Sequence, residues 1–427
     1  MTTALSSSAG RTPSRPNAPR TVADRTVAWV VSLFAATVLL QRLSLPGGIV
    51  PLLLPVIYLW CAAGLATGVL AFQPTRLRLF ALAGAATAAV AFLQLRFVTV
   101  PLISVTSWGL FLAVWLPAVV VLVDRSRATV LRAFAGSVTV GLWLAVVCIV
   151  MQLTQLAGLP YVDFVAVVVP EQLLVQGYVI TYPIEYASDV YRSNAWIGLE
   201  PSVVSLQLGV ALVLAILLRR RFLVLFTLFL GMATTVSGSG VLVVAIALLV
   251  MLLMPIRRQL LRYTLGGLVA LGLVLLLPVG QQLAARATEA TFSGSSTALR
   301  AIEPYRFLWP IWSPDTMAVL WGRGAGASQQ MVTDTNRAGL LVPSPVKVIF
   351  DYGVVAGLLL AVFLLFCYVG GPSRSLAVAL VVSSWVIQPG TTTVVLVAPT
   401  LLFITWWAPR LGQPVESDPL LPKEAPP

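Results

Sequence analysis

Twelve apolar runs follow one another along this chain of 427 residues, and they constrain its fold more than any other feature. A helix needs about 20 apolar residues to cross the hydrocarbon layer of a membrane, which is about 30 Å thick. Charged residues make up only 10% of the chain, whereas soluble domains contain about a quarter. The sequence therefore predicts an all-α polytopic integral membrane protein, with about 12 transmembrane helices over residues 25–410. The runs are centred near Ala35, Leu59, Ala86, Val114, Ala145, Val210, Leu228, Ile246, Leu271, Ala356, Val381 and Leu401.

The two ends of the chain are polar and differ in composition from the apolar runs. Residues 1–24 are rich in Ser, Thr, Pro and Arg, and residues 411–427 are rich in Pro. Both segments lack the apolar content needed to fold and are predicted to be disordered, the first as a basic arm and the second as a tail. The run Val27–Leu40 is not followed by a small-x-small cleavage site, so it is interpreted as the first span and not as a cleaved signal.

The basic residues predict the orientation of the spans. Lys and Arg outnumber Asp and Glu by 27 to 15, which gives a net charge of +12. With the amino terminus inside, 18 of the 27 basic residues fall in cytoplasmic loops and tails, as the positive-inside rule requires. Both termini are therefore predicted to be cytoplasmic, with the chain in the cytoplasmic (inner) membrane. The positive charge is attributed to this topology and not to a nucleic-acid partner.

Most of the polar residues predicted to lie outside are concentrated in two long loops, at about 158–198 and about 280–344. Loops of this length in a compact chain are usually functional, so the working site is expected at the outer face. The chain has no histidine, and its three cysteines lie in apolar runs without the spacing of a metal site. No metal and no cofactor are expected, and any proton transfer would fall to a carboxylate, a tyrosine or a lysine.

The segment "RSNAWIGLEPS", residues 192–202, places Glu200 directly before Pro201 at the start of an apolar run. Proline is favoured at the first position of a helix, so a span is predicted to begin at Pro201. The positive end of the helix dipole stabilises a carboxylate there, which is typical of an ordinary helix cap. The apolar residues before Glu200 favour a second interpretation, in which a functional carboxylate lies in a recess at membrane depth. The segment alone does not separate these two interpretations.

Three segments together resemble the membrane glycosyltransferases that include the O-antigen polymerases and O-antigen ligases. The first is Arg192 followed by Gly-x-Glu-Pro-Ser at the start of a span. The second is "TTVSGSGVLVV", residues 234–244, which is similar to a Thr-x-Ser-x-x-Gly turn but has Ser239 in place of an arginine. The third is the long loop, which ends in an acidic residue, Asp351, followed by x-Gly. The histidine of the family falls near Val342 here, and its absence favours the polymerase branch.

The resemblance implies an enzyme that polymerises polyprenyl-diphosphate-linked oligosaccharide repeat units into a cell-surface polysaccharide, at the outer face of the cytoplasmic membrane. Glu200 or Asp351 would be the carboxylate that accepts or orients the proton of the acceptor hydroxyl. Two other functions stay open: a ligase that transfers a lipid-linked glycan to another acceptor, and a non-enzymatic transporter of polysaccharide or lipid-linked sugars. A transporter is expected to place its polar residues at the bilayer midplane, whereas this chain concentrates them in the two loops.

Arginine and aromatic residues in the two loops are candidate ligands for such a substrate. A guanidinium group binds a diphosphate through two parallel hydrogen bonds, although pairing with acids of the same loop is expected to use about half of these arginines. Aromatic rings stack on sugars, although they also form belts at membrane interfaces. The stretch "GRGAGAS", residues 322–328, lacks the spacing of a nucleotide-binding loop and is interpreted as a turn. The candidates are Arg192, Arg300, Arg306 and Arg323 for the diphosphate, and Tyr186, Tyr191 and Trp309 for the sugars.

Overall fold

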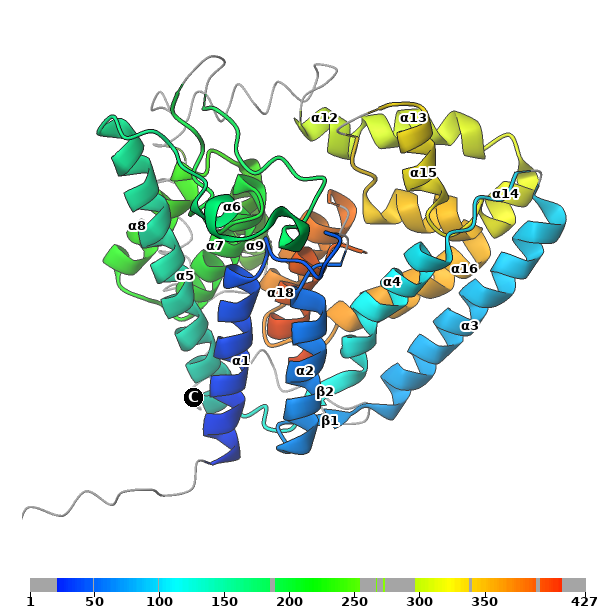
Figure 1. The fold of residues 1–427 in the computed structure, drawn as a ribbon. Helices are drawn as coiled ribbons and strands as arrows, with labels where there is room; N and C mark the ends of the chain where they lie inside the picture. Colours follow the sequence, from blue (N-terminus) through cyan, green and yellow to red (C-terminus); the bar gives the residue numbers. More distant parts are fainter. Residues whose placement is uncertain are drawn as a thin grey trace, which may run out of the picture.

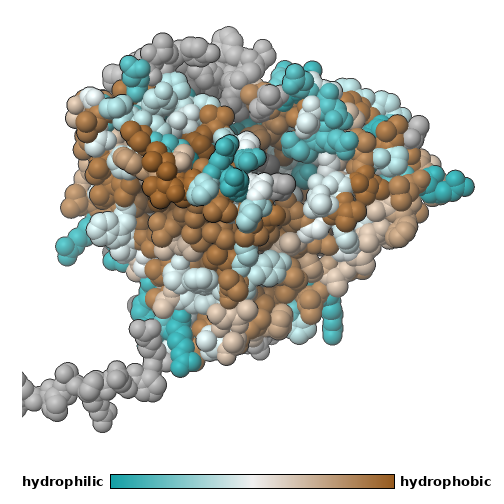
Figure 2. Space-filling model, viewed as in Figure 1, coloured by the Kyte–Doolittle hydropathy of each residue, from teal (hydrophilic) through white to brown (hydrophobic). Residues whose placement is uncertain are grey.

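The computed structural model in Figure 1 describes residues 21–48, 50–98, 100–184, 189–253, 266, 272, 296–337, 340–388 and 392–408. Four of its helices are long and apolar enough to cross a membrane. Figure 2 shows an apolar surface across the middle of the molecule, which fits contact with lipid. The chain is thus a helical membrane protein, as predicted. The four helices are α1 (Val22–Leu39), α3 (Pro74–Phe97), α5 (Arg127–Leu156) and α16 (Ser344–Tyr368).

The other predicted runs are also helical but shorter, apart from the one near Leu271, which lies largely outside the described residues. The number of spans stays a prediction, because several of these helices are shorter than the hydrocarbon layer requires. They are α2 (Leu53–Ala66), α4 (Val105–Trp115) with the 3-10 turn η1 (Leu116–Val119), α7 (Pro201–Leu217), α8 (Phe222–Thr234), α9 (Gly238–Leu253), α17 (Arg374–Leu380) with the π-helical turn η3 (Val381–Val386), and α18 (Val394–Phe403) with the 3-10 turn η4 (Thr405–Trp407).

Helix α7 lies inside the bundle, with nearly all of its side chains buried. It approaches α9 so closely that a Cβ atom on Gly209 would lie 2.7 Å from Gly240 Cα. Ser205 secures this crossing, because its hydroxyl donates to Ser237 O (3.1 Å) and accepts from Gly240 N–H (3.1 Å). Small residues and interhelical hydrogen bonds commonly allow such close approach in membranes. The predicted turn at residues 234–244 thus sets the start of α9 against α7.

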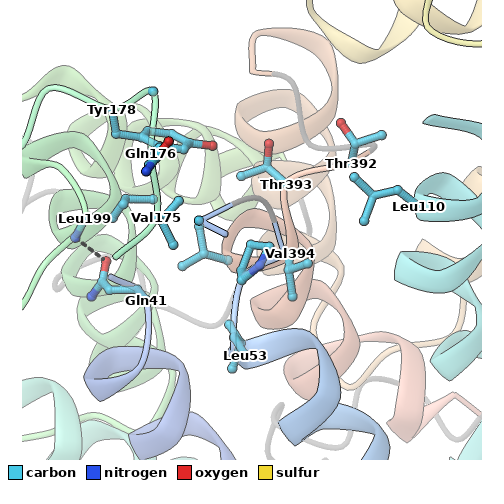
Figure 3. Close-up of a pocket in the computed structure, with 14 residues that line it drawn as sticks. Gln41, Leu53, Leu110, Val175, Gln176, Tyr178, Leu199, Thr392, Thr393 and Val394 are labelled. Atoms are coloured by element: carbon cyan, nitrogen blue, oxygen red, sulfur yellow. Dashed lines mark hydrogen bonds between the residues drawn. The ribbon is translucent and has the colours of Figure 1, made fainter. Parts of the chain in front are cut away.

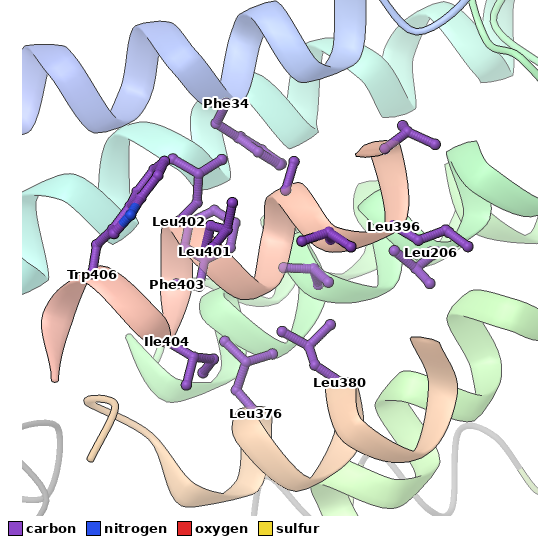
Figure 4. Packing of buried hydrophobic residues seen from close by; sticks show 14 of the residues in the cluster. Phe34, Leu206, Leu376, Leu380, Leu396, Leu401, Leu402, Phe403, Ile404 and Trp406 are labelled. Atoms are coloured by element: carbon purple, nitrogen blue, oxygen red, sulfur yellow. The ribbon is translucent and has the colours of Figure 1, made fainter. Parts of the chain in front are cut away.

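Helix α18 passes through the main apolar core (Figure 4). Its Phe403 ring packs edge-on against Phe34 of α1, with 5.1 Å between the ring centroids. Leu206 from α7 and Leu376 from α17 belong to the same buried cluster. A helix that is apolar on all sides is expected to be enclosed by its neighbours, and every residue of α18 is buried.

A two-stranded antiparallel ribbon lies at one end of the bundle, where the sequence predicted only helices and loops. In it β1 (Leu70–Phe72) pairs with β2 (Val120–Leu122), and Leu70 lies opposite Leu122. The valines of β2 favour this extended pairing because β-branched side chains pack well on a pleated surface. Arg76, at the start of α3 nearby, is buried and donates to Thr405 O (2.7 Å), which ties α3 to η4.

The predicted loop at 280–344 is folded into short helices over its described residues 296–337, which we call the helical lobe. A second apolar cluster joins the lobe to α16, and it includes Leu308 and Trp312 of the lobe and Phe350 of α16. It lies at the same end of the molecule as the 158–198 segment and opposite the ribbon (Figure 1). The helices of the lobe are α12 (Ser296–Ala301), α13 (Glu303–Trp312), α14 (Thr316–Trp321) and α15 (Ala327–Asp334), and those of the 158–198 segment are α6 (Phe164–Val168) and the 3-10 turn η2 (Glu171–Leu173).

Candidate active site

Glu200 precedes α7, and its backbone, not its side chain, starts the helix. Its φ and ψ of −148° and 155° are extended, and its carbonyl accepts hydrogen bonds from the N–H groups of Val203 (3.1 Å) and Val204 (3.2 Å). The carboxylate makes no capping hydrogen bond to the backbone of α7, a helix that the structure describes throughout. It accepts a hydrogen bond from Ser202 Oγ at 2.9 Å. The geometry therefore disfavours the helix-cap interpretation and leaves the carboxylate available to groups outside the helix.

Arg300 of α12 is the cation beside this carboxylate. Its Nη2 lies 3.7 Å from Glu200 Oε2, although Glu200 was predicted at the start of a span and Arg300 in the loop at 280–344. Both side chains are mostly buried, with 14% of Glu200 and 19% of Arg300 exposed. Burial raises the pKa of Glu200, and the lowering effects of Arg300 and Ser202 do not cancel this rise. A carboxylate with a raised pKa is better matched to general-base work near neutral pH than an ordinary glutamate.

Arg192 and Tyr182 extend the cluster around Glu200. The Arg192 guanidinium carbon lies 5.5 Å from the centre of the Tyr182 ring, a cation–π distance, and Arg192 N–H donates to Tyr182 O (2.9 Å). The Tyr182 phenol is within electrostatic reach of Glu200 and of both arginines. Burial raises the pKa of Tyr182, and Glu200 raises it further, so the hydroxyl stays protonated at neutral pH. The structure thus brings two predicted diphosphate ligands and one predicted catalytic carboxylate together.

A cavity of about 560 Å³ opens beside Glu200. This volume falls within the range of small-molecule sites, about 300–1,000 Å³. The cavity is lined by Leu199, the residue before Glu200, and by Tyr178, whose phenol is within electrostatic reach of the Glu200 carboxylate. Figure 3 shows Tyr178 pointing across the cavity toward Thr393 at the start of α18, and these two side chains interact.

Gln41 holds the backbone that leads into α7. Its Oε1 accepts a hydrogen bond from Leu199 N–H (3.1 Å), the contact drawn in Figure 3, and its Nε2 donates to Val38 O (2.9 Å). The same Nε2 lies 3.4 Å from Oε1 of Gln207, which is on α7. Both amide side chains are buried, so water does not compete for these contacts. The C-terminal end of α1 and the N-terminal end of α7 are therefore held together next to the cavity.

A buried ion pair anchors the 158–198 segment to the bundle. Arg42 donates to both carboxylate oxygens of Asp163, at 2.6 and 2.7 Å, and to Trp196 O (3.1 Å). Burial alone would raise the pKa of Asp163, but the hydrogen bonds and the charge of Arg42, together with hydrogen bonds from the backbone N–H groups of Val165 and Ala166, outweigh it and lower the pKa. The sequence offered no role for Arg42, since nothing near it in the chain marks Asp163 as its partner. The pair fixes the segment just ahead of Glu200.

Asp351, the second predicted catalytic carboxylate, is 0% exposed and has three hydrogen-bond donors. Its Oδ1 accepts from Ser328 N–H (2.8 Å), and its Oδ2 accepts from Gly326 N–H (3.0 Å) and from Lys347 Nζ (3.0 Å). These contacts hold the turn at residues 322–328 against α16. The geometry favours a structural role, because a carboxylate with no exposed surface offers no route of approach to a substrate.

The turn at residues 322–328 packs backbone to backbone against a kink in α16. Gly353 has a φ of 70° at the kink, and Gly322 has a φ of 80° in the turn. A Cβ atom on Gly322 would lie 2.4 Å from Asp351 O, so the contact requires glycine. Gln94 of α3 closes the junction by donating to the carbonyls of Trp321 (2.6 Å) and Asp351 (2.9 Å). The lobe is thereby joined to α3 and α16.

The other two predicted diphosphate ligands are paired within the lobe. Arg306 is 73% exposed and lies 3.7 Å from Glu303 of the same helix. Arg323 is mostly buried, donates to Ile311 O (2.9 Å) and lies 3.7 Å from Asp315. The contacts recorded for the described residues do not join either arginine to Glu200.

The predicted sugar ligands are dispersed. Tyr191 is half-buried and packs on Tyr161, with 5.6 Å between the ring centroids. Trp309 is exposed on α13, next to Trp312 at 5.3 Å between centroids. Tyr186 lies outside the described residues.

Tyr178 and Tyr182 are site residues that the sequence did not single out. Both belong to the predicted loop at 158–198, which carries five tyrosines in a stretch with little regular secondary structure. An irregular stretch has no periodicity that would show which side chains share a face. No regular spacing relates them to Arg192 and Glu200, so the sequence carried no signal, and only the folded segment places them beside the carboxylate.

Comparison with protein-family models, with curated proteins and with solved structures found no match to this chain. Within the residues that the structure describes, no group of three or more His, Cys, Asp and Glu residues could hold a metal ion. The candidate site, as the structure describes it, consists of a carboxylate of raised pKa, two guanidinium groups and two tyrosines beside a cavity.

Proposed function

We propose that this protein is a membrane glycosyltransferase that polymerises polyprenyl-diphosphate-linked oligosaccharide repeat units at the outer face of the cytoplasmic membrane. The pairing of Glu200 with Arg300 beside a cavity carries the proposal. Transfer from a diphosphate donor needs a proton acceptor for the attacking hydroxyl and a cation for the leaving group in one site, and these two residues supply both. The resemblance of the sequence to O-antigen polymerases supports the same chemistry. Both termini are proposed to be cytoplasmic, with the lobe and the cavity outside.

In the proposed reaction, a hydroxyl of the acceptor sugar attacks the anomeric carbon of the lipid-linked donor. A bond forms between the acceptor oxygen and the anomeric carbon, and the bond from that carbon to the phosphate oxygen breaks. The polyprenyl diphosphate leaves with the electron pair of the broken bond. Glu200 accepts the proton of the attacking hydroxyl, and its raised pKa suits this task near neutral pH.

The arginines of the cluster stabilise the negative charge of the leaving diphosphate. Arg300 Nη2 lies 3.7 Å from Glu200 Oε2, which is longer than a charge-assisted hydrogen bond, so the contact with Glu200 does not prevent the guanidinium from turning toward a diphosphate. Arg192 adds a second guanidinium, held by its backbone and ring contacts with Tyr182. Two guanidinium groups match the two phosphates of the donor.

The lipid-linked products of a deletion strain test the proposal. Loss of a polymerase should leave single lipid-linked repeat units and no long surface chains. The wild-type gene should restore the long chains, whereas Glu200→Gln should not, at an equal amount of protein in the membrane. Accumulation of long lipid-linked chains would instead indicate a ligase. Unchanged lipid-linked pools and unchanged surface polysaccharide would overturn the proposal.

A further inference from the structure

The cavity beside Glu200 is lined by neutral groups. None of the 14 described residues that line it carries a charge. The polar part of the lining consists of the amide of Gln176 and the hydroxyls of Tyr178, Thr392 and Thr393, because the amide of Gln41 is already hydrogen-bonded to the protein.

Amides and hydroxyls each donate and accept hydrogen bonds, as the hydroxyls of a sugar do. The remaining walls are aliphatic, with Leu53, Leu110 and Val394 visible in Figure 3, and suit the apolar face of a pyranose ring. The chemistry of the lining is therefore that of a site for an uncharged, hydroxyl-rich group.

The charged residues of the candidate site adjoin the cavity but do not line it. Glu200 follows the lining residue Leu199 and is within electrostatic reach of the lining residue Tyr178. Arg42, which follows Gln41 in the chain, forms an ion pair with Asp163. An anionic group inside the cavity would lose its hydration without gaining a cation from the described residues of the lining. Glu200 adds no net repulsion, because Arg300 lies 3.7 Å from it and Arg192 adds a second cation, so the cost of desolvation alone should disfavour an anion in the cavity by about tenfold.

We propose that the cavity binds the terminal sugar of the acceptor and that this sugar is neutral: a hexose, a deoxyhexose or an N-acetylhexosamine without carboxylate or phosphate. The inference rests on the proposed function and adds the class of acceptor. The acceptor hydroxyl reaches Glu200 past Tyr178, while the diphosphate of the donor stays with Arg300 and Arg192. The two substrates are thus sorted by charge between the cavity and the arginines.

Thiol labelling tests the charge selectivity of the cavity without any need for transfer activity. Thr393→Cys places a thiol on the cavity wall, and the native cysteines are buried. An anionic methanethiosulfonate reagent should modify this thiol about tenfold more slowly than an uncharged reagent of similar size, after correction by the ratio measured for the exposed control Thr106→Cys. Equal corrected rates for the two reagents would overturn the inference.

Chemical analysis of the lipid-linked repeat unit from the deletion strain tests the acceptor directly. We expect its non-reducing terminal residue to be neutral, whatever charges occur elsewhere in the unit. A uronic acid, a sialic acid or a phosphate on that residue would overturn the inference and leave the polymerase function intact. A strain that accumulates no lipid-linked unit would instead remove the proposed function.

Discussion

Glu200 and Asp351 are two carboxylates that each stand beside a cation, yet their surroundings differ. Asp351 has three donors at 2.8 to 3.0 Å and is completely buried. Glu200 has one hydroxyl donor at 2.9 Å, a cation at 3.7 Å and a cavity next to it. A saturated buried carboxylate stabilises the fold, whereas one with few donors beside a cavity stays available for chemistry. The donors around a carboxylate, more than its place in a motif, indicate its role.

The two ion pairs also differ in their origin. Lys347 and Asp351 are four residues apart on one helical face, so their pairing is a local event. Arg300 and Glu200 come from the helical lobe and from the start of α7, so their pairing needs both regions to be folded. A local pair is suited to hold a helix and a turn together, and a long-range pair can be opened by a substrate.

The largest effect is expected on stability, when the Asp351 carboxylate is removed. Asp351→Ala leaves Lys347 and two backbone N–H groups without their partner, so the free energy of unfolding should fall by about 3–5 kcal/mol. Chemical unfolding in detergent measures this change. The matched control is Asp334→Ala on the exposed face of α15, expected to change stability by less than about 0.5 kcal/mol. An Asp351→Ala protein as stable as the control would show that this carboxylate does not hold the lobe.

A substitution at Glu200 should lower activity and should not lower stability. Glu200→Gln removes the proton acceptor, so polymer formation should fall by about 100-fold. Because the folded-state pKa is raised, ionised Glu200 costs stability as the pH rises through that pKa, and the amide removes this cost. The melting temperature at neutral pH should therefore be unchanged or higher. Glu303→Gln in the lobe is the control, with activity expected within about twofold of wild type. Normal chain extension by Glu200→Gln would contradict a catalytic role.

The pH dependence of polymer formation tests whether Arg300 acts on the pKa of Glu200. Activity should be lost as the pH falls through the folded-state pKa of Glu200, and this loss should occur at a higher pH than for an ordinary glutamate. Arg300 lowers that pKa, so Arg300→Gln should move the acid limb to higher pH, by up to about one unit. The control Arg306→Gln should leave the limb in place. If the acid limb of the pH profile is unchanged in Arg300→Gln, the group that titrates is not Glu200.

The smallest effect is expected at Arg306, which is exposed and pairs within its own helix. Arg306→Lys should change the rate of polymer formation by less than about twofold, because exposed ion pairs contribute about 0–1 kcal/mol. The same change at Arg300 should lower the rate about tenfold, since an ammonium group cannot form the two-point contact of a guanidinium. Equal losses at both positions would place the diphosphate across the lobe surface and away from Glu200.

Hydropathy located the helices well because the requirement behind it is local. The runs near Ala35 and Val210 lie within α1 and α7, and α7 begins at Pro201 as predicted. The lobe was predicted as a loop because its helices have 6 to 10 residues, too few for a periodic apolar signal. Their starts depend on local contacts such as Asp315, whose carboxylate accepts from the N–H groups at the start of α14.

The site was predicted in part. Glu200, Arg192 and Arg300 were identified by residue type and by motif, and the structure places them in one cluster. Nothing in the sequence separated Arg300 from Arg306, which flank Glu303 in the same short stretch. Their difference is one of direction, because the Arg300 side chain reaches α7 and the Arg306 side chain reaches solvent.

By itself the sequence determined that this chain is a helical membrane protein, because each apolar run must satisfy its own backbone hydrogen bonds in lipid. It also excluded histidine as a proton acceptor, since the chain has none. Only the tertiary structure decided that Glu200 meets Arg300 beside a neutral cavity while Asp351 is closed off by its donors. The energy of a charged group depends on distance, burial and available donors, and these are set where segments distant in the chain come together.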